Sequence, residues 1–138
     1  MKTKALLDAS YAIALSSSSD SFHQQAVQLA SELEAAKTRL ITTRAVIFEI
    51  GNALAKQRYR QAAVKLLNAL EADPNVEIIP LSEDLYARAI KLYRERPDKE
   101  WGLTDCVSFV VMQEREITEA LTTDEHFEQA GFHVLLRK

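Results

Sequence analysis

Short apolar runs alternate along the chain with longer segments in which apolar residues recur at intervals of three and four. The short runs are typical of buried strands, and the longer segments are typical of helices with one apolar face. The predicted strands cover residues 4–8, 39–43, 76–80, 119–124 and 132–136. The predicted helices cover about residues 21–36, 43–57, 59–72, 82–94, 104–115 and 125–130. Such alternation is typical of a parallel sheet flanked by helices on both faces, so we predict one α/β domain over residues 1–138.

Local signals mark several of the predicted helix ends. The serine-rich run at residues 16–21 is the only low-complexity segment and is expected to be a loop. Ser21 opens a possible capping box for the helix that follows it. Thr43 and Ser82 are suitable N-caps for two later helices. Pro74 stops the helix that ends just before it, because the residue preceding a proline avoids helical geometry.

Composition restricts the class of protein. With 138 residues, of which 47% are hydrophobic, the chain can bury the core of one compact domain. A net charge of −3 excludes a protein that coats nucleic acid by bulk electrostatics, although a local basic patch remains possible. No apolar run approaches the ~20 residues of a membrane span, so we expect no membrane partner. Cys106 is the only cysteine, which excludes an internal disulfide and fits a cytoplasmic location.

Four carboxylates fall where the predicted topology would gather them. Asp8 ends the first predicted strand and Asp124 ends the fourth. Asp105 lies in the first turn of the otherwise apolar helix in GLTDCVSFVVMQE. Glu49 lies two turns into the helix that follows the second strand, on the same side as Ile50. Because the carboxyl ends of parallel strands share one edge of a sheet, the four acids could converge there.

Each acid also has a structural interpretation. Asp105 could simply favour a helix N-terminus through the helix dipole. Asp8 and Asp124 could cap the helices that follow them, and Glu49 could be a satisfied structural acid. Glu49, however, has no cation three or four residues away along its helix. The joint placement of all four acids therefore favours a shared site.

Clustered carboxylates repel one another unless a cation neutralises them. Hard oxygen ligands suit Mg²⁺ or Mn²⁺, and such a site is typical of phosphoryl chemistry. His23, His126 and His133 show no metal-binding spacing and are expected at the surface or in packing. The chain has no glycine-rich phosphate loop and no GxSxG motif. Ser10 stands where a haloacid-type phosphotransferase would need a second acid.

Four segments, taken in order, resemble the PIN-domain family. They read LLDASYAIAL, TTRAVIFEIGNAL, GLTDCVSFVVMQE and ALTTDEHFEQAGFHVLL, and the resemblance covers essentially the whole chain. Within the family, the chain is most similar to the VapC-type toxins of bacterial toxin–antitoxin pairs. The resemblance implies a five-stranded parallel sheet and an endoribonuclease site that depends on Mg²⁺ or Mn²⁺. It assigns the catalytic and metal-binding positions to Asp8, Glu49, Asp105 and Asp124.

The resemblance also suggests residues that support these acids. Hydroxyl groups are expected behind them at Ser10, Thr104 and Thr123, whereas Ala9 stands where a hydroxyl residue is common in the family. Asp98 is either a further supporting acid or a plain turn residue.

Basic residues near the predicted site could form a rim that contacts RNA phosphates, or could simply be a solvated face. They are Arg44, Lys56, Arg58, Arg60, Arg94, Arg96 and Lys99. Phe48 projects away from the apolar side of its helix, which indicates a dimer or partner contact or else an ordinary core contact. The resemblance itself implies a homodimer and a cognate antitoxin protein.

Three functions are compatible with these patterns. The first is a metal-dependent endoribonuclease that hydrolyses RNA phosphodiester bonds, as the toxin of a toxin–antitoxin pair. The second is a catalytically silent PIN-fold module that binds RNA or another protein. The third is a phosphohydrolase acting on small substrates, which would need a specificity pocket that the sequence does not reveal. The presence of all four acids favours the first.

Overall fold

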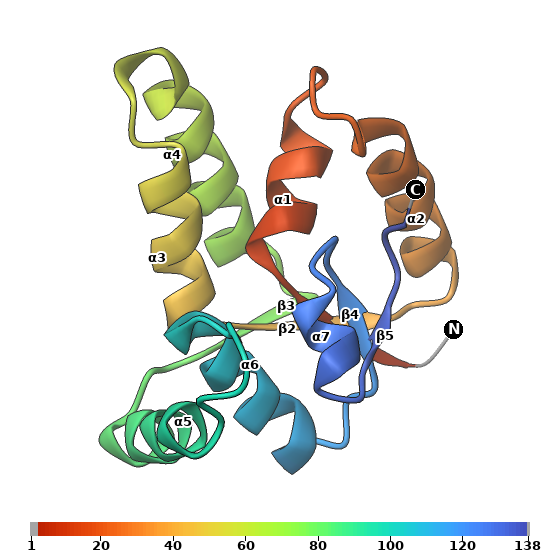
Figure 1. Ribbon diagram of the computed structural model, residues 1–138. Helices are drawn as coiled ribbons and strands as arrows, with labels where there is room; N and C mark the ends of the chain where they lie inside the picture. Colours follow the sequence, from red (N-terminus) through yellow and green to blue (C-terminus); the bar gives the residue numbers. More distant parts are fainter. Residues whose placement is uncertain (1–2, 138) are drawn as a thin grey trace.

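Five parallel strands form a single sheet at the centre of the protein (Figure 1). The computed structural model describes residues 3–137, so residues 1, 2 and 138 of the predicted domain lie outside the described part. The strands are β1 (Lys4–Leu7), β2 (Arg39–Thr43), β3 (Val76–Ile79), β4 (Glu119–Leu121) and β5 (His133–Val134). The predicted five-stranded parallel sheet in an α/β fold is confirmed.

Helices cover both faces of the sheet (Figure 1). One group comprises α1 (Ala9–Ser16), α2 (His23–Ala35), α3 (Arg44–Ala53) and α4 (Gln57–Ala72). The other comprises α5 (Glu83–Glu95), α6 (Leu103–Glu114) and α7 (His126–Gln129). The two groups bury separate hydrophobic cores, because successive side chains of a strand point to opposite faces. In β1, Ala5 and Leu7 pack in the first core and Leu6 packs in the second.

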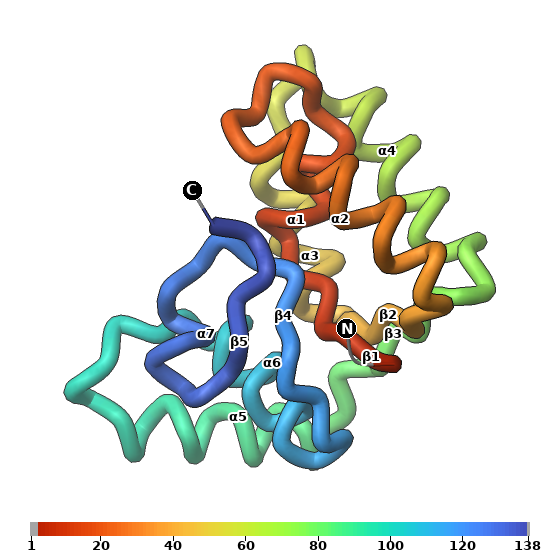
Figure 2. Tube along the Cα trace, turned by 90° about the vertical axis from the view of Figure 1, so that its right-hand side faces the viewer, coloured from red at the N-terminus to blue at the C-terminus, as the bar shows by residue number. Residues whose placement is uncertain are grey.

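The order of the strands creates a topological switch point beside β1. The order is β3-β2-β1-β4-β5, so the chain moves outward from β1 to β3 and then returns to place β4 on the other side of β1. Figure 2 shows β4 and β5 on one side of β1, and β2 and β3 on the other. Leu7 at the end of β1 is in register with Leu121 at the end of β4. Ligands of open α/β sheets bind outside the carboxyl ends of the strands at such a point.

The helix α1 was not predicted from the sequence. It begins directly after Asp8, and four of its eight residues are buried: Ala9, Tyr11, Ala12 and Ala14. A helix that is largely apolar all round has no polar stripe, so it lacks the periodicity that reveals an amphipathic helix. Four strands are also shorter than predicted: β1 ends at Leu7, β3 at Ile79 and β4 at Leu121, and β5 covers only His133–Val134. The strand β2 has the predicted bounds.

The predicted helix caps had mixed outcomes. Thr43 caps α3 by accepting a 3.2 Å hydrogen bond from the Val46 N–H, and Ser82 caps α5 through Leu85 at 3.1 Å, as predicted. The capping box at Ser21 was wrong. The N-cap of α2 is Phe22, whose N–H donates to Asp20 Oδ1 at 2.8 Å, so the aspartate of the serine-rich loop forms the turn instead.

In the described part of the chain, no helix combines the length and the apolar character that a membrane crossing requires.

Candidate metal centre

Asp8 is the most buried acid at the switch point. It directly follows β1 and is 4% exposed. Its Oδ2 accepts hydrogen bonds from Thr122 Oγ1 at 2.7 Å and from Ser10 Oγ at 3.4 Å. Its Oδ1 is buried and has no hydrogen-bond partner among the described residues. Burial is the main cause that raises the pKa of Asp8 to about 6, and the hydrogen bond from Thr122 opposes this rise.

Hydroxyl groups connect the end of β1 to the segment after β4. Ser10 Oγ lies 3.2 Å from Thr122 Oγ1 and accepts a 3.1 Å hydrogen bond from the Thr123 N–H. Thr122 Oγ1 also accepts from the Asp124 N–H at 3.1 Å. These hydrogen bonds fix the position of Asp8 relative to Asp124 across the switch point.

Asp105 enters the site from the first turn of α6. Its Oδ2 accepts a 3.1 Å hydrogen bond from the N–H of Gly102, the N-cap of the helix. The capping interpretation of this acid is therefore realised, but with one oxygen only. Burial raises the pKa of Asp105 and repulsion from Asp124 adds to the rise, whereas the bonds from Gly102 and His126 lower it.

His126, the first residue of α7, lies between two of the acids. Its Nδ1 is 3.3 Å from Asp105 Oδ2 and 3.3 Å from Asp124 Oδ1. Its backbone N–H also donates to Asp124 Oδ1 at 2.9 Å. One ligand atom from each of Asp105, Asp124 and His126 lies within 4.8 Å of the others, so the three side chains can hold a metal ion. The expectation that His126 is only a surface or packing residue was wrong.

Glu49 faces the same cluster from α3. It is partly buried, and in residues 3–137 its carboxylate forms no hydrogen bond or ion pair. Burial, followed by repulsion from Asp8, Asp105 and Asp124, raises the pKa of Glu49 to about 7. Its electrostatic interaction with the other three acids is what is expected of residues gathered at one sheet edge.

The donor set fits a divalent cation. Four carboxylates come from four different elements, and among residues 3–137 no lysine or arginine forms an ion pair with any of them. The unpartnered Asp8 Oδ1 is a buried oxygen without a donor, which is costly unless a proton or a metal satisfies it. Hard oxygen donors of this kind suit Mg²⁺ or Mn²⁺, and the added imidazole also suits later first-row ions.

Of the three hydroxyl residues predicted to support the acids, only Ser10 contacts one of them through its hydroxyl group in the described part of the chain. Ser10 contacts Asp8, but the second hydroxyl at Asp8 belongs to Thr122, and Thr123 contributes its backbone N–H instead. The chain turns directly after β4, where Thr122 Oγ1 also accepts from the Asp124 N–H, and in this turn the hydroxyl of Thr122 rather than that of Thr123 reaches Asp8. No hydrogen bond of the Thr104 hydroxyl is found within the described residues.

Asp98 does not contact the four acids. It accepts two 3.0 Å hydrogen bonds from Arg96 in the loop between α5 and α6, as an exposed turn residue would.

The predicted basic rim is partly committed to other contacts. Arg44 forms an ion pair with Glu71 on α4. Arg96, besides its pair with Asp98, lies 5.1 Å from the centre of the Trp101 ring. The guanidinium of Arg58 lies 4.8 Å over the Tyr59 ring, and Arg60 donates to the Ala55 carbonyl oxygen at 2.7 Å. No ion pair of the remaining three is found among residues 3–137: Lys56, Arg94 and Lys99.

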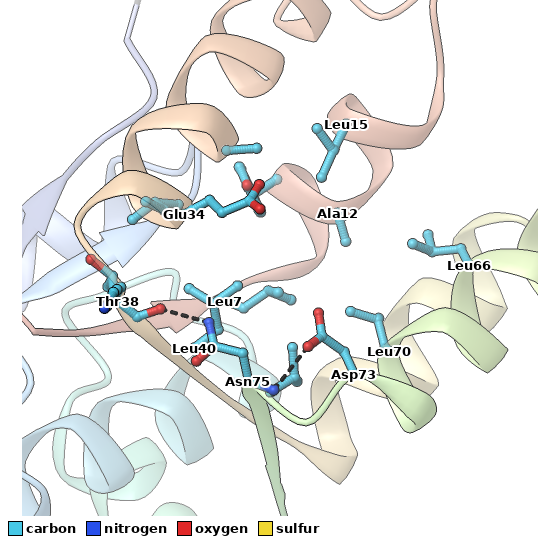
Figure 3. A pocket seen from close by; sticks show the side chains of 15 residues that line it. Leu7, Ala12, Leu15, Glu34, Thr38, Leu40, Leu66, Leu70, Asp73 and Asn75 are labelled. Atoms are coloured by element: carbon cyan, nitrogen blue, oxygen red, sulfur yellow. Dashed lines mark hydrogen bonds between the residues drawn. The ribbon is translucent and has the colours of Figure 1, made fainter.

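Two apolar features remain: the exposed side chain of Phe48 and a hollow between three helices. Phe48 is 68% exposed on α3, so it is not a core residue. A hollow of about 520 Å³ lies between α1, α2 and α4, with apolar walls that include Leu15, Leu66 and Leu70 (Figure 3). Asn75 closes one end, where its side chain donates to the Thr38 carbonyl oxygen at 2.8 Å (Figure 3). None of the four acids lines this hollow.

The profile of the PIN domain family matches residues 5–133, and the chain therefore belongs to that family. Solved structures extend the match to VapC-type toxins, as the sequence resemblance predicted. VapC20 of Mycobacterium tuberculosis, described as a toxin that cleaves the sarcin–ricin loop, is 26% identical with a TM-score of 0.81. The match covers 93% of this chain and 95% of VapC20.

Two more distant structures share the fold. VapBC2 from Rickettsia felis, bound to a promoter DNA fragment, is 12% identical with a TM-score of 0.66, over 95% of this chain and 96% of that one. FitAcB from Neisseria gonorrhoeae is 18% identical with a TM-score of 0.65, over 94% and 95%. No curated protein matches the chain.

Proposed function

We propose that this protein is a metal-dependent endoribonuclease that hydrolyses RNA phosphodiester bonds. The observation that carries the proposal is the meeting of four carboxylates at the β1–β4 switch point, where no lysine or arginine of residues 3–137 forms an ion pair with them. Membership of the PIN-domain family and the similarity to a toxin that cleaves the sarcin–ricin loop support it.

In this proposal the side chains of the site have two roles: some bind the metal ion and others orient those ligands. Asp8, Glu49, Asp105 and Asp124 would hold a Mg²⁺ or Mn²⁺ ion, with His126 as a nitrogen donor beside Asp105 and Asp124. When bound, the ion supplies Lewis-acid chemistry at the scissile phosphate and for the attacking water. Thr122 and Ser10 orient Asp8 through their hydroxyl groups. The helix start at Gly102 orients Asp105.

The test is cleavage of single-stranded and looped RNA by purified protein. Mg²⁺ or Mn²⁺ should support cleavage, EDTA should stop it, and added metal should restore it. Equal activity in EDTA would overturn the metal mechanism. Complete inactivity on varied RNAs, with metal bound, would favour a module that binds RNA without cleaving it.

The proposal includes an antitoxin partner and a homodimer. The support is the fold shared with VapBC2 and FitAcB, together with the exposed Phe48 and the apolar hollow between α1, α2 and α4. If the protein is such a toxin, a small protein encoded by the neighbouring gene should co-purify with it and inhibit cleavage. A neighbouring product that neither binds nor inhibits would leave a nuclease without an antitoxin. Sedimentation of the protein alone, compared with that of a Phe48→Ser variant, tests the dimer.

A further inference from the structure

A second hollow is lined by residues from the end of α5, the loop that follows it and the start of α6. Its volume is about 430 Å³, within the ~300 to 1,000 Å³ typical of small-molecule pockets. The residues that matter for its chemistry are Tyr93, Arg94, Arg96, Lys99, Trp101 and Cys106. The hollow therefore combines cations with aromatic rings.

Two of its cations have no direct ionic partner. Arg96 is held by Asp98 and lies over Trp101. Within residues 3–137, neither Arg94 nor Lys99 forms an ion pair, although both line the hollow. One carboxylate, Glu100, also lines the hollow. Lys99 is close enough to Asp98 to help lower the pKa of that carboxyl. Cations that line a hollow without an ion pair suit a phosphate group.

The two aromatic residues of the hollow differ in exposure and in contacts. Trp101 is 6% exposed, donates from Nε1 to Gln129 at 3.1 Å and packs edge-on to Phe109 at 5.0 Å, so it forms a fixed wall. Tyr93, near the end of α5, is 49% exposed. Unstacked bases of single-stranded RNA bind such exposed rings with little sequence preference.

The hollow and the acidic cluster both involve the first turn of α6, where Cys106 is close enough to Asp105 for the carboxylate to raise the pKa of the thiol. Trp101 precedes Gly102, whose N–H donates to Asp105 Oδ2 at 3.1 Å. Cys106, which lines the hollow, directly follows Asp105. A strand whose phosphate lies at the acids could therefore place a neighbouring nucleotide in the hollow.

We propose that this hollow is a nucleotide subsite of the enzyme, in which Tyr93 stacks on an RNA base and Arg94 and Lys99 bind its phosphate. The inference rests on the proposed ribonuclease function. It adds a second site that binds the RNA strand next to the scissile bond. The side chains of this site are not the four acids.

Trp101 makes the subsite directly observable, because it is the only tryptophan in the chain. The protein is titrated in EDTA, so that RNA is not cleaved, and Trp101 fluorescence is recorded. The two probes are a single-stranded RNA octamer of mixed sequence and an octamer of the same length without bases. The intact octamer should change the fluorescence saturably and bind roughly tenfold more tightly than the abasic one, as expected for one stacked base.

Variants separate the two parts of the subsite. Tyr93→Ala should bring the affinity for the intact octamer down to that for the abasic one. The double variant Arg94→Ala, Lys99→Ala should weaken both probes by a similar factor and reduce their salt dependence. Tyr86→Ala is the control, since Tyr86 lies on the same helix, is 47% exposed and does not line the hollow.

Equal binding of the two probes by wild type, or a Tyr93→Ala variant that binds like wild type, would overturn the subsite. Cleavage with Mg²⁺ that persists in that case would leave the ribonuclease proposal standing. If instead the intact octamer binds in the expected way but no metal supports cleavage, the subsite stands and hydrolysis fails.

Discussion

Thr122 Oγ1 donates a 2.7 Å hydrogen bond to Asp8 Oδ2 across the switch point between β4 and β1. Asp8 is 4% exposed, and its other oxygen is unpartnered among the described residues. The threonine is therefore the strongest protein contact of the most buried acid. It fixes Oδ2 of Asp8, whereas the buried Oδ1 has no donor among the described residues.

Replacing Thr122 with Val should weaken metal binding, because Val keeps the shape of the side chain but removes the donor that orients Asp8. We expect a loss of roughly tenfold or more in Mg²⁺ or Mn²⁺ affinity by calorimetry, as is usual for residues that orient metal ligands. The metal-free variant should also lose about 1 to 3 kcal/mol of stability in urea melts.

Thr123→Val is the matched control, since Thr123 reaches Ser10 through its backbone N–H, which the substitution keeps. A Thr123→Val variant that loses as much metal affinity as Thr122→Val would show that the Asp8 contact is not what matters.

Thr122 and Thr123 also show which parts of the site could be predicted from the sequence and which could not. The strand ends, the parallel topology and hence the meeting of Asp8 with Asp124 follow from short apolar runs between helices. Which of the two adjacent threonines faces Asp8 depends on the turn after β4, where Thr122 Oγ1 accepts from the Asp124 N–H, and a strand pattern does not predict that turn. The predicted strand extended to Asp124, whereas β4 ends at Leu121.

Other features of the site had no signal of their own in the sequence. His126 has no metal-binding spacing with another histidine, and it meets Asp105 only because α7 packs against α6. The helix α1 had no polar stripe to reveal it. Glu49, in contrast, was predicted to point inward from the apolar residues around it, and it faces the cluster.

Asp105→Asn separates a metal site from a structural cap. Asn keeps a side-chain oxygen that can accept from the Gly102 N–H, so the helix start should survive. Two like charges ~4 to 5 Å apart repel by about 3 to 4 kcal/mol at an effective dielectric of ~20, before screening. The metal-free variant should therefore be as stable as wild type or more stable by about 1 kcal/mol. Mg²⁺ should raise the melting temperature of wild type and do much less for the variant, by linkage.

Cleavage by the Asp105→Asn variant should fall by orders of magnitude. Asp98→Asn serves as the control, because Asp98 is an exposed acid paired with Arg96 outside the cluster. Its Mg²⁺ response should equal that of wild type. An Asp105→Asn variant that melts well below wild type without metal, yet cleaves normally per folded molecule, would mean that Asp105 only caps its helix.

The metal-free protein should lose stability as the pH rises from about 5 to 8. Folding raises the pKa of Asp8 from 3.8 to about 6 and that of Glu49 from 4.5 to about 7. Between the unfolded and folded pKa values the folded state binds more protons, so stability is greatest below the unfolded pKa and is lost through the folded pKa. Melting temperatures in EDTA should therefore fall across this window.

Two experiments test whether the acidic cluster causes this loss of stability with rising pH. Saturating Mg²⁺ should flatten the pH dependence, because the metal replaces the protons on the acids. The double variant Asp8→Asn, Glu49→Gln should flatten it without metal. A wild-type protein whose melting temperature in EDTA rises steadily from pH 5 to 8 would contradict the raised pKa values.

His126→Ala tests whether the imidazole binds the metal or only holds the acids in place. If Nδ1 is a ligand, the wild type should prefer Co²⁺ and Mn²⁺ to Mg²⁺ more than an all-carboxylate site does, because imidazole suits later first-row ions. The variant should lose roughly tenfold in Co²⁺ affinity and much less in Mg²⁺ affinity, measured by calorimetry. The backbone N–H that holds Asp124 is kept.

The control is His133→Ala, because the side chain of His133 is 65% exposed and lies 3.6 Å from Glu119, outside the cluster. Equal losses for all three ions would show that His126 positions Asp105 and Asp124 without binding the metal.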